Sequence, residues 1–349
     1  MDEFIFDYLK GNKKNLNAIG HEAINSLNSL SKKYQLIGFI SSIYKFSSDD
    51  KLEDLQFIRR ISVAKNLIMT NDLHEICKKF NSKKINYCVL KGPALVHAKI
   101  YKSGVRFFRD LDILVSKKDL NLAHKTLNQI GFHYENKFAN NSCDVLGNMH
   151  HLPIMINDNG TYLELHHRAT IAKNYLNCPI SDKILKDKIF YNGMYIPSPE
   201  ALIGHALYHG LVHHDDIIGP ITLFDLKEIS KKFNLHFDAN NEYVEALGLD
   251  RELKKIKNLF ISIEKESYTH RFREKLDHIN QNIVFKHSSE NKIDTFNLKK
   301  IIKKLGNNFF YNKVELTEFK YQIKRTNFKF IFFYVLELLG SIKRKIKFF

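Results

Sequence analysis

Glycine and proline, the residues that most often form turns, are scarce in this chain. Its 349 residues include only 15 glycines and 6 prolines. A many-stranded sandwich or barrel needs a turn about every 8–12 residues, so this scarcity argues against both architectures. A hydrophobic fraction of 44% also excludes a largely disordered chain. We therefore predict a folded, helix-rich protein with one small sheet.

Cysteine is also rare, and its spacing excludes two common uses. The four cysteines lie far apart in the sequence and form no Cys-x-x-Cys pair; they are Cys77, Cys88, Cys143 and Cys178. Neither a zinc knuckle nor a disulfide framework is indicated, so reduced thiols are expected. The first ten residues lack the basic, apolar and small-residue pattern of a secretory signal peptide. We therefore expect a cytoplasmic protein.

No uninterrupted apolar run is long enough to span a bilayer, which takes about 20 residues. The most apolar stretch, residues 328–339, is interrupted by Lys329 and Glu337. After it, basic residues alternate with apolar ones up to residue 349. This C-terminal tail could contact an anionic membrane surface peripherally. It could equally be a helix docked on the N-terminal helices, with a solvated basic end.

Acidic residues are outnumbered by basic ones. The chain has 54 lysines and arginines against 38 aspartates and glutamates, which gives a formal net charge of +16. Such a charge attracts partners that carry phosphate: nucleotides, nucleic acid or an anionic membrane. A lysine-rich surface without such a partner would give the same number. No RNP, KH or comparable motif supports RNA recognition, so nucleic acid is a partner that the charge merely permits.

Helical periodicity dominates both ends of the chain. Apolar residues recur at helical spacing over residues 15–84, where Asn71 is the expected N-cap of the last helix. From residue 197 to about 305 the pattern is helical again, with its strongest segments at 199–213 and 223–233. We expect helical parts on both sides of a different, central region.

The central region alternates short apolar strands with helices. The expected elements are a strand at 85–90, a helix from Gly92, a strand at 110–115, a helix at 117–130 between Ser116 as N-cap and Gly131, and a hairpin of 153–156 and 161–166. Asp158-Asn159-Gly160 is a typical turn for that hairpin. The predicted order is β-α-β-α-β-β.

Two aspartates on the second strand carry the strongest chemical signal. Asp110 and Asp112 are two residues apart, and on a β-strand such residues lie on the same face. Two adjacent carboxylates are unfavourable unless a cation neutralises them, and their hard oxygen atoms suit Mg²⁺ or Mn²⁺. Glu164, on the last predicted strand, would be the third ligand of a two-metal site. The pair alone could also be the solvated face of an edge strand.

The elements around these carboxylates form three motifs. They are Leu90-Lys91-Gly92 after the first strand, the block GVRFFRDLDILV over residues 104–115, and Leu163-Glu164-Leu165-His166 on the last strand. In these motifs the chain resembles the DNA polymerase β-like nucleotidyltransferase superfamily. It looks more closely like a bacterial family of uncharacterised nucleotidyltransferases with an LKG turn, a G-x-R-x-x-x-D-x-D block and an E-L-H strand. The resemblance covers residues 85–168 well and extends loosely to about residue 232.

The resemblance implies an α+β fold, in which a small mixed β-sheet nucleotidyltransferase core is flanked by helices and by helical N-terminal and C-terminal parts. The expected division is a helical part at 1–84, the core at 85–196, a helical domain that closes the nucleotide cleft at 197–305, and a basic helical tail at 306–349. The turn departs from the wider superfamily, which usually has Gly-Ser or Gly-Gly there. Pro93 removes one backbone N–H, and the LKG form suggests that Lys91 supplies charge instead.

Further residues are predicted to bind the nucleotide or to support the site. They are Lys91, Gly92, Arg106, Arg109, His166, His209, His213 and Asp225. Guanidinium groups could hold a triphosphate bidentately, although Arg109 could instead pair with Asp119 or another surface acid. His166 alternates with Glu164 and therefore faces the same side of its strand.

The last three of these residues, His209, His213 and Asp225, lie in the second helical region. There His205, His209 and His213 are spaced four residues apart, which places them along one face of a helix. Such a stripe could bind Zn²⁺, although no motif such as HExxH accompanies it. The resemblance implies instead that His209, His213 and Asp225 face the nucleotide cleft. Asp225 could orient a histidine, hold the acceptor or belong to a buried polar network.

Three functions fit these features. The first is a Mg²⁺- or Mn²⁺-dependent enzyme that transfers a nucleoside monophosphate from a nucleoside triphosphate, with ATP expected, to a small molecule such as a sugar or specialised metabolite, and releases pyrophosphate. The second is the same chemistry on tRNA or protein, as in a toxin-like enzyme. The third is a catalytically degenerate nucleotide-binding protein, which the unusual turn suggests. We favour the first because all three carboxylates and the turn are present.

Overall fold

The computed structural model describes residues 2–12, 14–15, 36–45, 53–102, 104–135, 150–170, 179–213, 219–235, 237, 241–265, 272 and 274. Within this part of the chain, Cys77 and Cys88 are free, buried thiols. Three sequence predictions lie outside it: the tail at 306–349, the helices at 275–305, and the state of the other two cysteines.

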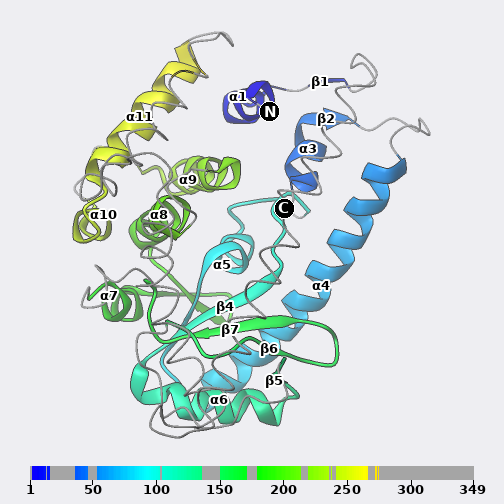
Figure 1. The fold of residues 1–349 in the computed structure, drawn as a ribbon, viewed down its shortest axis with the longest axis vertical. Coiled ribbons are helices and arrows are strands. Elements are labelled where there is room, and N and C mark those ends of the chain that lie inside the picture. The colour runs from blue at the N-terminus through cyan, green and yellow to red at the C-terminus, as the bar shows by residue number, and fades with distance from the viewer. Residues whose placement is uncertain are drawn as a thin grey trace, which may run out of the picture.

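A five-stranded mixed sheet forms the centre of the fold (Figure 1). Its strands, in spatial order, are β3 (Tyr87–Val89), β4 (Asp110–Val115), β7 (Tyr162–His166), β6 (Met155–Ile156) and β5 (His133–Tyr134). β4 and β7 run parallel, whereas the other neighbouring strands run antiparallel. The predicted α+β fold with a mixed sheet is confirmed. β5 is an additional strand, and its two residues are too few to show a strand period in the sequence.

Helices cover both faces of the sheet, so β4 is buried on both sides from Leu111 to Val115. α5 (Lys91–His97) follows β3 and packs against β4. α6 (Leu120–Gln129) lies on the opposite side of the sheet from α5 (Figure 1). As predicted, Gly131 follows α6 in the left-handed region, with a φ of 88° that favours glycine.

Ser116 occupies the predicted N-cap position, and the helix begins with a short 3₁₀ turn, Lys117–Asp119, that runs into α6. The Ser116 hydroxyl, however, donates to the Asp119 carboxylate, 2.6 Å away, and accepts no bond from a helix N–H. The other predicted N-cap is wrong. Asn71 does not cap a helix, because α4 (Glu53–Ser82) continues through it. Asn71 is exposed and the next residue, Asp72, is buried, so the sequence keeps its helical pattern and nothing interrupts the helix.

The N-terminal part is helical, with one exception that the sequence did not indicate. α1 (Asp2–Lys10) and α3 (Ile37–Ile43) precede the long helix α4. The two-residue strands β1 (Lys14–Asn15) and β2 (Tyr44–Lys45) pair in parallel beside them. Both strands lie in the stretch that was predicted to be helical, and the prediction is wrong there.

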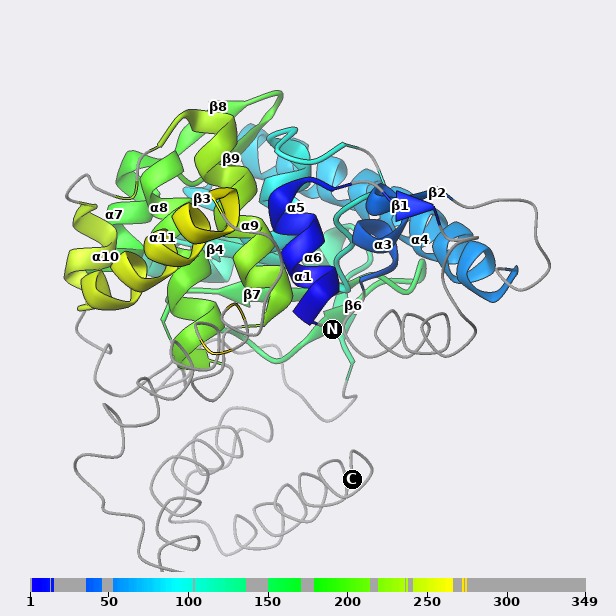
Figure 2. The same cartoon turned by 90° about the horizontal axis from the view of Figure 1, so that it is seen from above.

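The second helical part follows a hairpin that was also not predicted. After α7 (Ile180–Asp187), the hairpin consists of β8 (Ile189–Tyr191) and β9 (Met194–Ile196). The helices that follow are α8 (Pro199–Tyr208), α9 (Pro220–Phe233), α10 (Glu242–Ala246) and α11 (Asp250–Lys265). α1 packs against α9 and α11, so the first and last described helices lie together (Figure 2). In the described part of the chain, no helix is both long and apolar enough to cross a membrane.

The hairpin of β6 and β7 is fixed to α4 by a single buried carboxylate. Asp72 of α4 accepts hydrogen bonds from Asn157 Nδ2 at 2.9 Å and Asn159 Nδ2 at 2.8 Å, and also from the Thr161 hydroxyl. Gly160 has the positive φ that the predicted turn requires. These bonds hold the start of β7 and therefore the strand that carries Glu164.

Candidate active site

Strand pairing brings the predicted carboxylates together. Asp112 on β4 and Glu164 on β7 are direct partners in the parallel register, and Asp110 pairs with Tyr162 two positions earlier. Side chains two apart on a strand share a face, so Asp110, Asp112 and Glu164 form one acidic cluster. Asp112 is 1% exposed, whereas Asp110 and Glu164 are half-buried. The cluster therefore opens to solvent through Asp110 and Glu164.

Lys91 neutralises part of this cluster. It follows β3 with a φ of 53°, in the left-handed region, which costs about 1 kcal/mol for a residue other than glycine. Its Nζ lies 2.5 Å from Asp112 Oδ1 and 3.9 Å from Glu164 Oε2. Burial lowers the pKa of Lys91, but the neighbouring carboxylates, Asp112 first, raise it more, and the net shift is upward. The ammonium is therefore held as a cation between two of the three carboxylates.

His166 neutralises the cluster from the other side. Its Nε2 lies 2.9 Å from Asp112 Oδ1 and 3.3 Å from Glu164 Oε2. Burial lowers the pKa of the imidazole, but hydrogen bonds to the two carboxylates raise it further, so the net shift favours imidazolium. The rings of His150 and His151 stand 5.3 and 5.2 Å from that of His166. Glu164 and His166 share a face, as the alternation predicts.

The three carboxyl groups differ in their protonation behaviour. Burial raises the pKa of Asp112, but Lys91 and His166 lower it further, to about 2. Burial likewise opposes ionisation of Glu164, yet its hydrogen bond with His166 leaves the pKa well below the usual range. For Asp110, burial and the charge of Asp112 raise the pKa to about 6. Asp110 is thus the carboxylate whose charge is least compensated.

The donor set fits a divalent cation. Within the described residues, Asp112, Glu164 and His166 offer ligand atoms that all lie within 4.8 Å of one another. Asp110 lies outside this group, but it has no hydrogen bond or ion pair with any described residue, although it is half-buried beside Asp112. The negative charge of the three carboxylates therefore exceeds the positive charge of the side chains around them. A bound cation would neutralise the excess.

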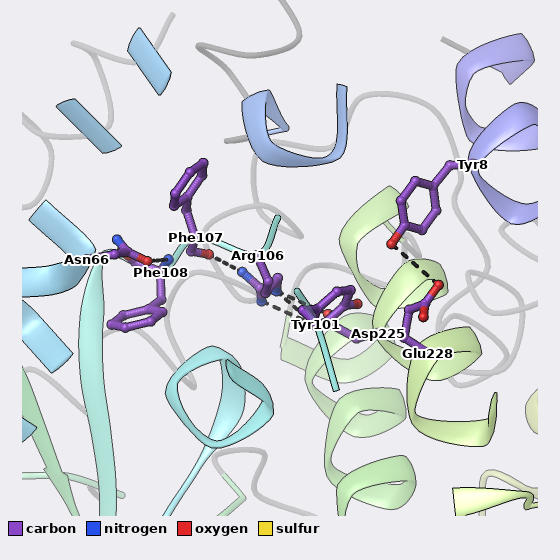
Figure 3. Close-up of polar contacts among 8 residues, drawn as sticks. All are labelled: Tyr8, Asn66, Tyr101, Arg106, Phe107, Phe108, Asp225 and Glu228. Atoms are coloured by element: carbon purple, nitrogen blue, oxygen red, sulfur yellow. Dashed lines mark hydrogen bonds and ion pairs between the residues drawn. The ribbon is translucent and has the colours of Figure 1, made fainter. Parts of the chain in front are cut away.

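Arg106 lies against the LKG turn but binds a carboxylate of the helical part. Its Nε and Nη2 lie 3.1 and 3.2 Å from the two oxygens of Asp225 on α9, and the Tyr101 hydroxyl donates to the same carboxylate at 2.6 Å (Figure 3). A Cβ on Gly92 would lie 3.5 Å from Arg106 Cζ. Burial lowers the pKa of Arg106, but the charge of Asp225 raises it more, and the net shift is upward. Asp110 contributes a smaller upward shift.

Comparison with known proteins identifies the family to which the chain belongs. A family model described as uncharacterised nucleotidyltransferase matches residues 40–259, more than half of the chain. The chain belongs to this family. No curated protein matches it. A similar solved structure is that of an antigenic nucleotidyltransferase-like protein from Paracoccidioides brasiliensis, with 16% identity, a TM-score of 0.36, and coverage of 59% of this chain and 96% of that one. A TM-score this low supports no argument about either fold or function.

In this nucleotidyltransferase, the remaining predicted residues are placed as follows. Arg109 is exposed at the start of β4. Asp119, its suggested partner, accepts from the Ser116 hydroxyl and the Asn86 N–H. Asp225 belongs to a buried polar network with Tyr101 and Arg106, one of the three alternatives for it.

The predicted histidine stripe changes geometry half-way. α8 ends at Tyr208, and a π-helical turn, His209–His213, replaces the regular helix, so the four-residue spacing no longer defines one face beyond His209. The rings of His205 and His209 lie 6.3 Å apart. The side chain of His213 lies outside what the structure describes. The predicted roles of His209 and His213 in the nucleotidyltransferase cleft stay predictions.

The sequence did not indicate Tyr101. In the structure its hydroxyl completes the Asp225 network. In the sequence it is one apolar residue at the end of a predicted helix, and its partner is 124 residues away along the chain. Only the tertiary structure, which brings Tyr101 to Asp225 of α9, reveals that its hydroxyl has a partner.

Proposed function

We propose that this nucleotidyltransferase transfers a nucleoside monophosphate from a nucleoside triphosphate, ATP in the first instance, to a small-molecule acceptor and releases pyrophosphate. The observation that carries the proposal is the direct pairing of Asp112 with Glu164 across two parallel strands, with the unpartnered Asp110 on the same face. Family membership supplies the class of reaction. The cluster supplies a place for the metal that such chemistry uses.

Asp110, Asp112 and Glu164 would hold Mg²⁺ or Mn²⁺, and His166 is close enough to both Asp112 and Glu164 to join them. The bound metal would supply charge stabilisation for the phosphates and a more acidic attacking oxygen. Because Mg²⁺ prefers oxygen ligands, participation of the imidazole would favour Mn²⁺. Without the metal, Lys91 and His166 keep Asp112 and Glu164 ionised and in place.

Lys91 and Gly92 would hold the phosphates of the triphosphate. The Lys91 ammonium already lies in the acidic cluster, and its long side chain can exchange a carboxylate oxygen for a phosphate oxygen without a change in the backbone. Gly92 has no side chain that would separate the turn from Arg106. Arg106 would hold the far side of the turn, with its guanidinium oriented by Asp225.

Glu164 would support the attacking group. In the transfer, the bond between the α-phosphorus and the oxygen that bridges to the β-phosphorus breaks, and a bond between the α-phosphorus and the acceptor oxygen forms. The acceptor proton passes to Glu164 or, through it, to solvent. His166 fixes the Glu164 carboxylate, so the proton acceptor is oriented before the substrate binds.

This proposal is tested by pyrophosphate release. The protein is mixed with Mg²⁺, one nucleoside triphosphate at a time and a small-molecule cell extract, and released pyrophosphate is measured. We expect release with at least one nucleotide, and a fall of about 100-fold or more in Asp112→Asn and Asp110→Ala. Asp158→Asn, which changes an exposed carboxylate on the β6–β7 turn, is the matched control and should have no effect. Equal rates in all four proteins would contradict the proposal.

One observation favours a second candidate, a nucleotide-binding protein without catalysis. Lys91 and His166 already neutralise Asp112 and Glu164, so the cluster persists without a metal. This candidate predicts nucleotide binding that is independent of Mg²⁺ and no pyrophosphate release with any extract. The enzyme predicts tighter nucleotide binding with Mg²⁺ and loss of that gain in Asp112→Asn.

A further inference from the structure

A cavity of about 1030 Å³ lies beside the acidic cluster and contains none of its three carboxylates. Its walls are α1, the middle of α4, residues 96–108 and the C-terminal half of α9, with additions from residues 42–43. Ligand sites for small molecules commonly have about 300–1,000 Å³, so the cavity is slightly larger than that range. It is large enough to hold a second substrate in addition to the nucleotide.

The cavity is strongly basic. Of the described residues that line it, six are basic and one is acidic. Four of the six, Lys99, Lys102, Lys231 and Lys232, are exposed, and none of them forms an ion pair with a described residue. A cavity lined by charge of one sign concentrates ligands of the opposite sign. Four uncompensated ammonium groups therefore point to an anionic occupant.

The other charged residues of the cavity are engaged in its wall. The Lys227 ammonium lies 3.3 Å from the Tyr8 carbonyl oxygen and also contacts that of Leu9, so it caps the last turn of α1. The Tyr8 hydroxyl donates to Glu228 at 3.5 Å (Figure 3). These contacts fasten α9 to α1. Among the described residues of the lining, the one acidic group is thus committed to Tyr8 rather than to the four lysines.

The wall nearest the acidic cluster is apolar and held in place. The Asn66 side chain on α4 donates to the Phe108 carbonyl at 3.0 Å and accepts from the Phe108 N–H at 3.1 Å (Figure 3). Phe107 and Phe108 line the cavity next to Arg106, which Asp225 fixes. Arg106 also lies close to the LKG turn, because a Cβ added to Gly92 would come within 3.5 Å of its guanidinium carbon. The cavity therefore reaches the neighbourhood of the LKG turn.

We propose that this cavity binds the acceptor, and that the acceptor is a small molecule with a phosphate group and an apolar or aromatic part. The lysines of α9 and of residues 99–102 would take the phosphate, and the wall of Phe107 and Phe108 would take the apolar part. That the bound molecule is the acceptor rests on the proposed function. The anion site itself stands on the charge and shape of the cavity. Lysine ammonium groups commonly bind phosphate, as compact point charges with three donors each.

Pyridoxal 5′-phosphate tests the anion site without knowledge of the substrate. Its aldehyde condenses with a lysine amine and loses water, and borohydride reduces the imine to a stable secondary amine that peptide mapping locates. The full chain is labelled at limiting reagent with EDTA present. We expect labelling of the four cavity lysines, averaged per lysine, to be about tenfold faster than that of Lys117 and Lys118, an exposed pair on the 3₁₀ turn. A tenfold difference corresponds to ~1.4 kcal/mol. Inorganic phosphate should abolish the preference, and pyridoxal, which lacks the phosphate, should show none.

Two variants locate the effect. Lys231→Glu/Lys232→Glu should remove the preferential labelling of Lys99 and Lys102, whereas the matched change Lys117→Glu/Lys118→Glu should leave it intact. Asp112→Asn should also leave it intact, so that the cavity is distinguished from the acidic cluster and this inference can fail or succeed independently of catalysis.

Several results would overturn the inference. They are equal labelling of cavity and control lysines, preferential labelling of Lys91 alone, and the same preference with pyridoxal. Protection of the cavity lysines by a tRNA mixture at concentrations where phosphate gives none would assign the surface to nucleic acid and would overturn it as well.

Discussion

At the scale of single residues, the acidic cluster shows how neighbours decide the state of a charge. Asp112 and Glu164 have lowered pKa values because Lys91 and His166 contact them, although both are partly or fully buried. Asp110, two residues from Asp112, has no such contact, and its pKa rises to about 6. The same strand therefore carries one carboxylate that stabilises the fold when ionised and one that destabilises it.

This contrast predicts that Asp110→Asn stabilises the metal-free protein. The folded-state pKa of Asp110 is raised, so the folded state binds more protons than the unfolded state between about pH 4 and pH 6, and stability falls as pH rises through that window. At pH 7.5 the substitution should raise the free energy of unfolding by about 1–3 kcal/mol. The gain should shrink towards pH 4. Urea denaturation in EDTA at both pH values measures it.

Asp112→Asn is the control at the same scale. Its folded-state pKa is lowered to about 2, so its ionised form stabilises the protein above the unfolded-state value of about 4, and that stability is lost as pH falls towards 2. The substitution should lower the free energy of unfolding at pH 7.5, opposite in sign to Asp110→Asn. Loss of stability in both variants at pH 7.5 would mean that Asp110 has a partner that compensates its charge.

At the scale of elements, the position of β7 depends on the docking of its hairpin on α4. Asp72 is 4% exposed and accepts from three side chains of residues 157–161. Asp72→Ala leaves those buried donors without an acceptor and should lower the free energy of unfolding by about 2–4 kcal/mol. Pyrophosphate release should fall too, because β7 carries Glu164. Asp158→Ala, on the exposed side of the same turn, is the control, and an equal loss there would contradict the role of Asp72.

The sequence predicted the elements whose signal is local. β4, β7, the turn with Gly160 and the apolar stripe of α6 follow from periodicity and turn residues that lie next to one another in the chain. The short strands β5, β8 and β9 were not predicted, because two or three residues show no period of two. The equally short β3 and β6 were predicted because they lie in longer apolar runs or beside a recognisable turn. The docking of the hairpin on Asp72 joins residues 85–89 apart and has no local signal.

At the scale of the whole molecule, the Arg106–Asp225 ion pair joins the sheet core to the helical part that follows it. The two residues are 119 apart in the sequence, and the side chains of both are nearly buried. Asp225→Asn would leave the Arg106 charge without a counter-ion and should lower the free energy of unfolding by about 3–5 kcal/mol. Tyr101→Phe removes one hydrogen bond from the same carboxylate and should lower it by only about 1 kcal/mol. Equal small losses in a urea titration would contradict this role.

The acidic cluster could be predicted from the sequence, whereas the basic cavity could not. Asp110, Asp112 and Glu164 could be proposed because strand periodicity and three motifs point to one sheet face. The partners Lys91 and His166 could be named from the motifs, but their contacts with Asp112 depend on register. The cavity is formed by five segments between residues 8 and 232, and only the one at residues 96–108 overlaps a motif, at Gly104 to Phe108. Only their packing brings its lysines together.

If the cluster of Asp110, Asp112 and Glu164 serves the transfer of a nucleoside monophosphate, a label on the nucleotide must follow a defined route. The protein is incubated with Mg²⁺, a small-molecule cell extract and either α-labelled or γ-labelled ATP. We predict that the α-label appears in a new product, that the γ-label leaves as pyrophosphate, and that Asp112→Asn abolishes both. The γ-label in the product, or a transfer that Asp112→Asn leaves unchanged, would contradict the claim.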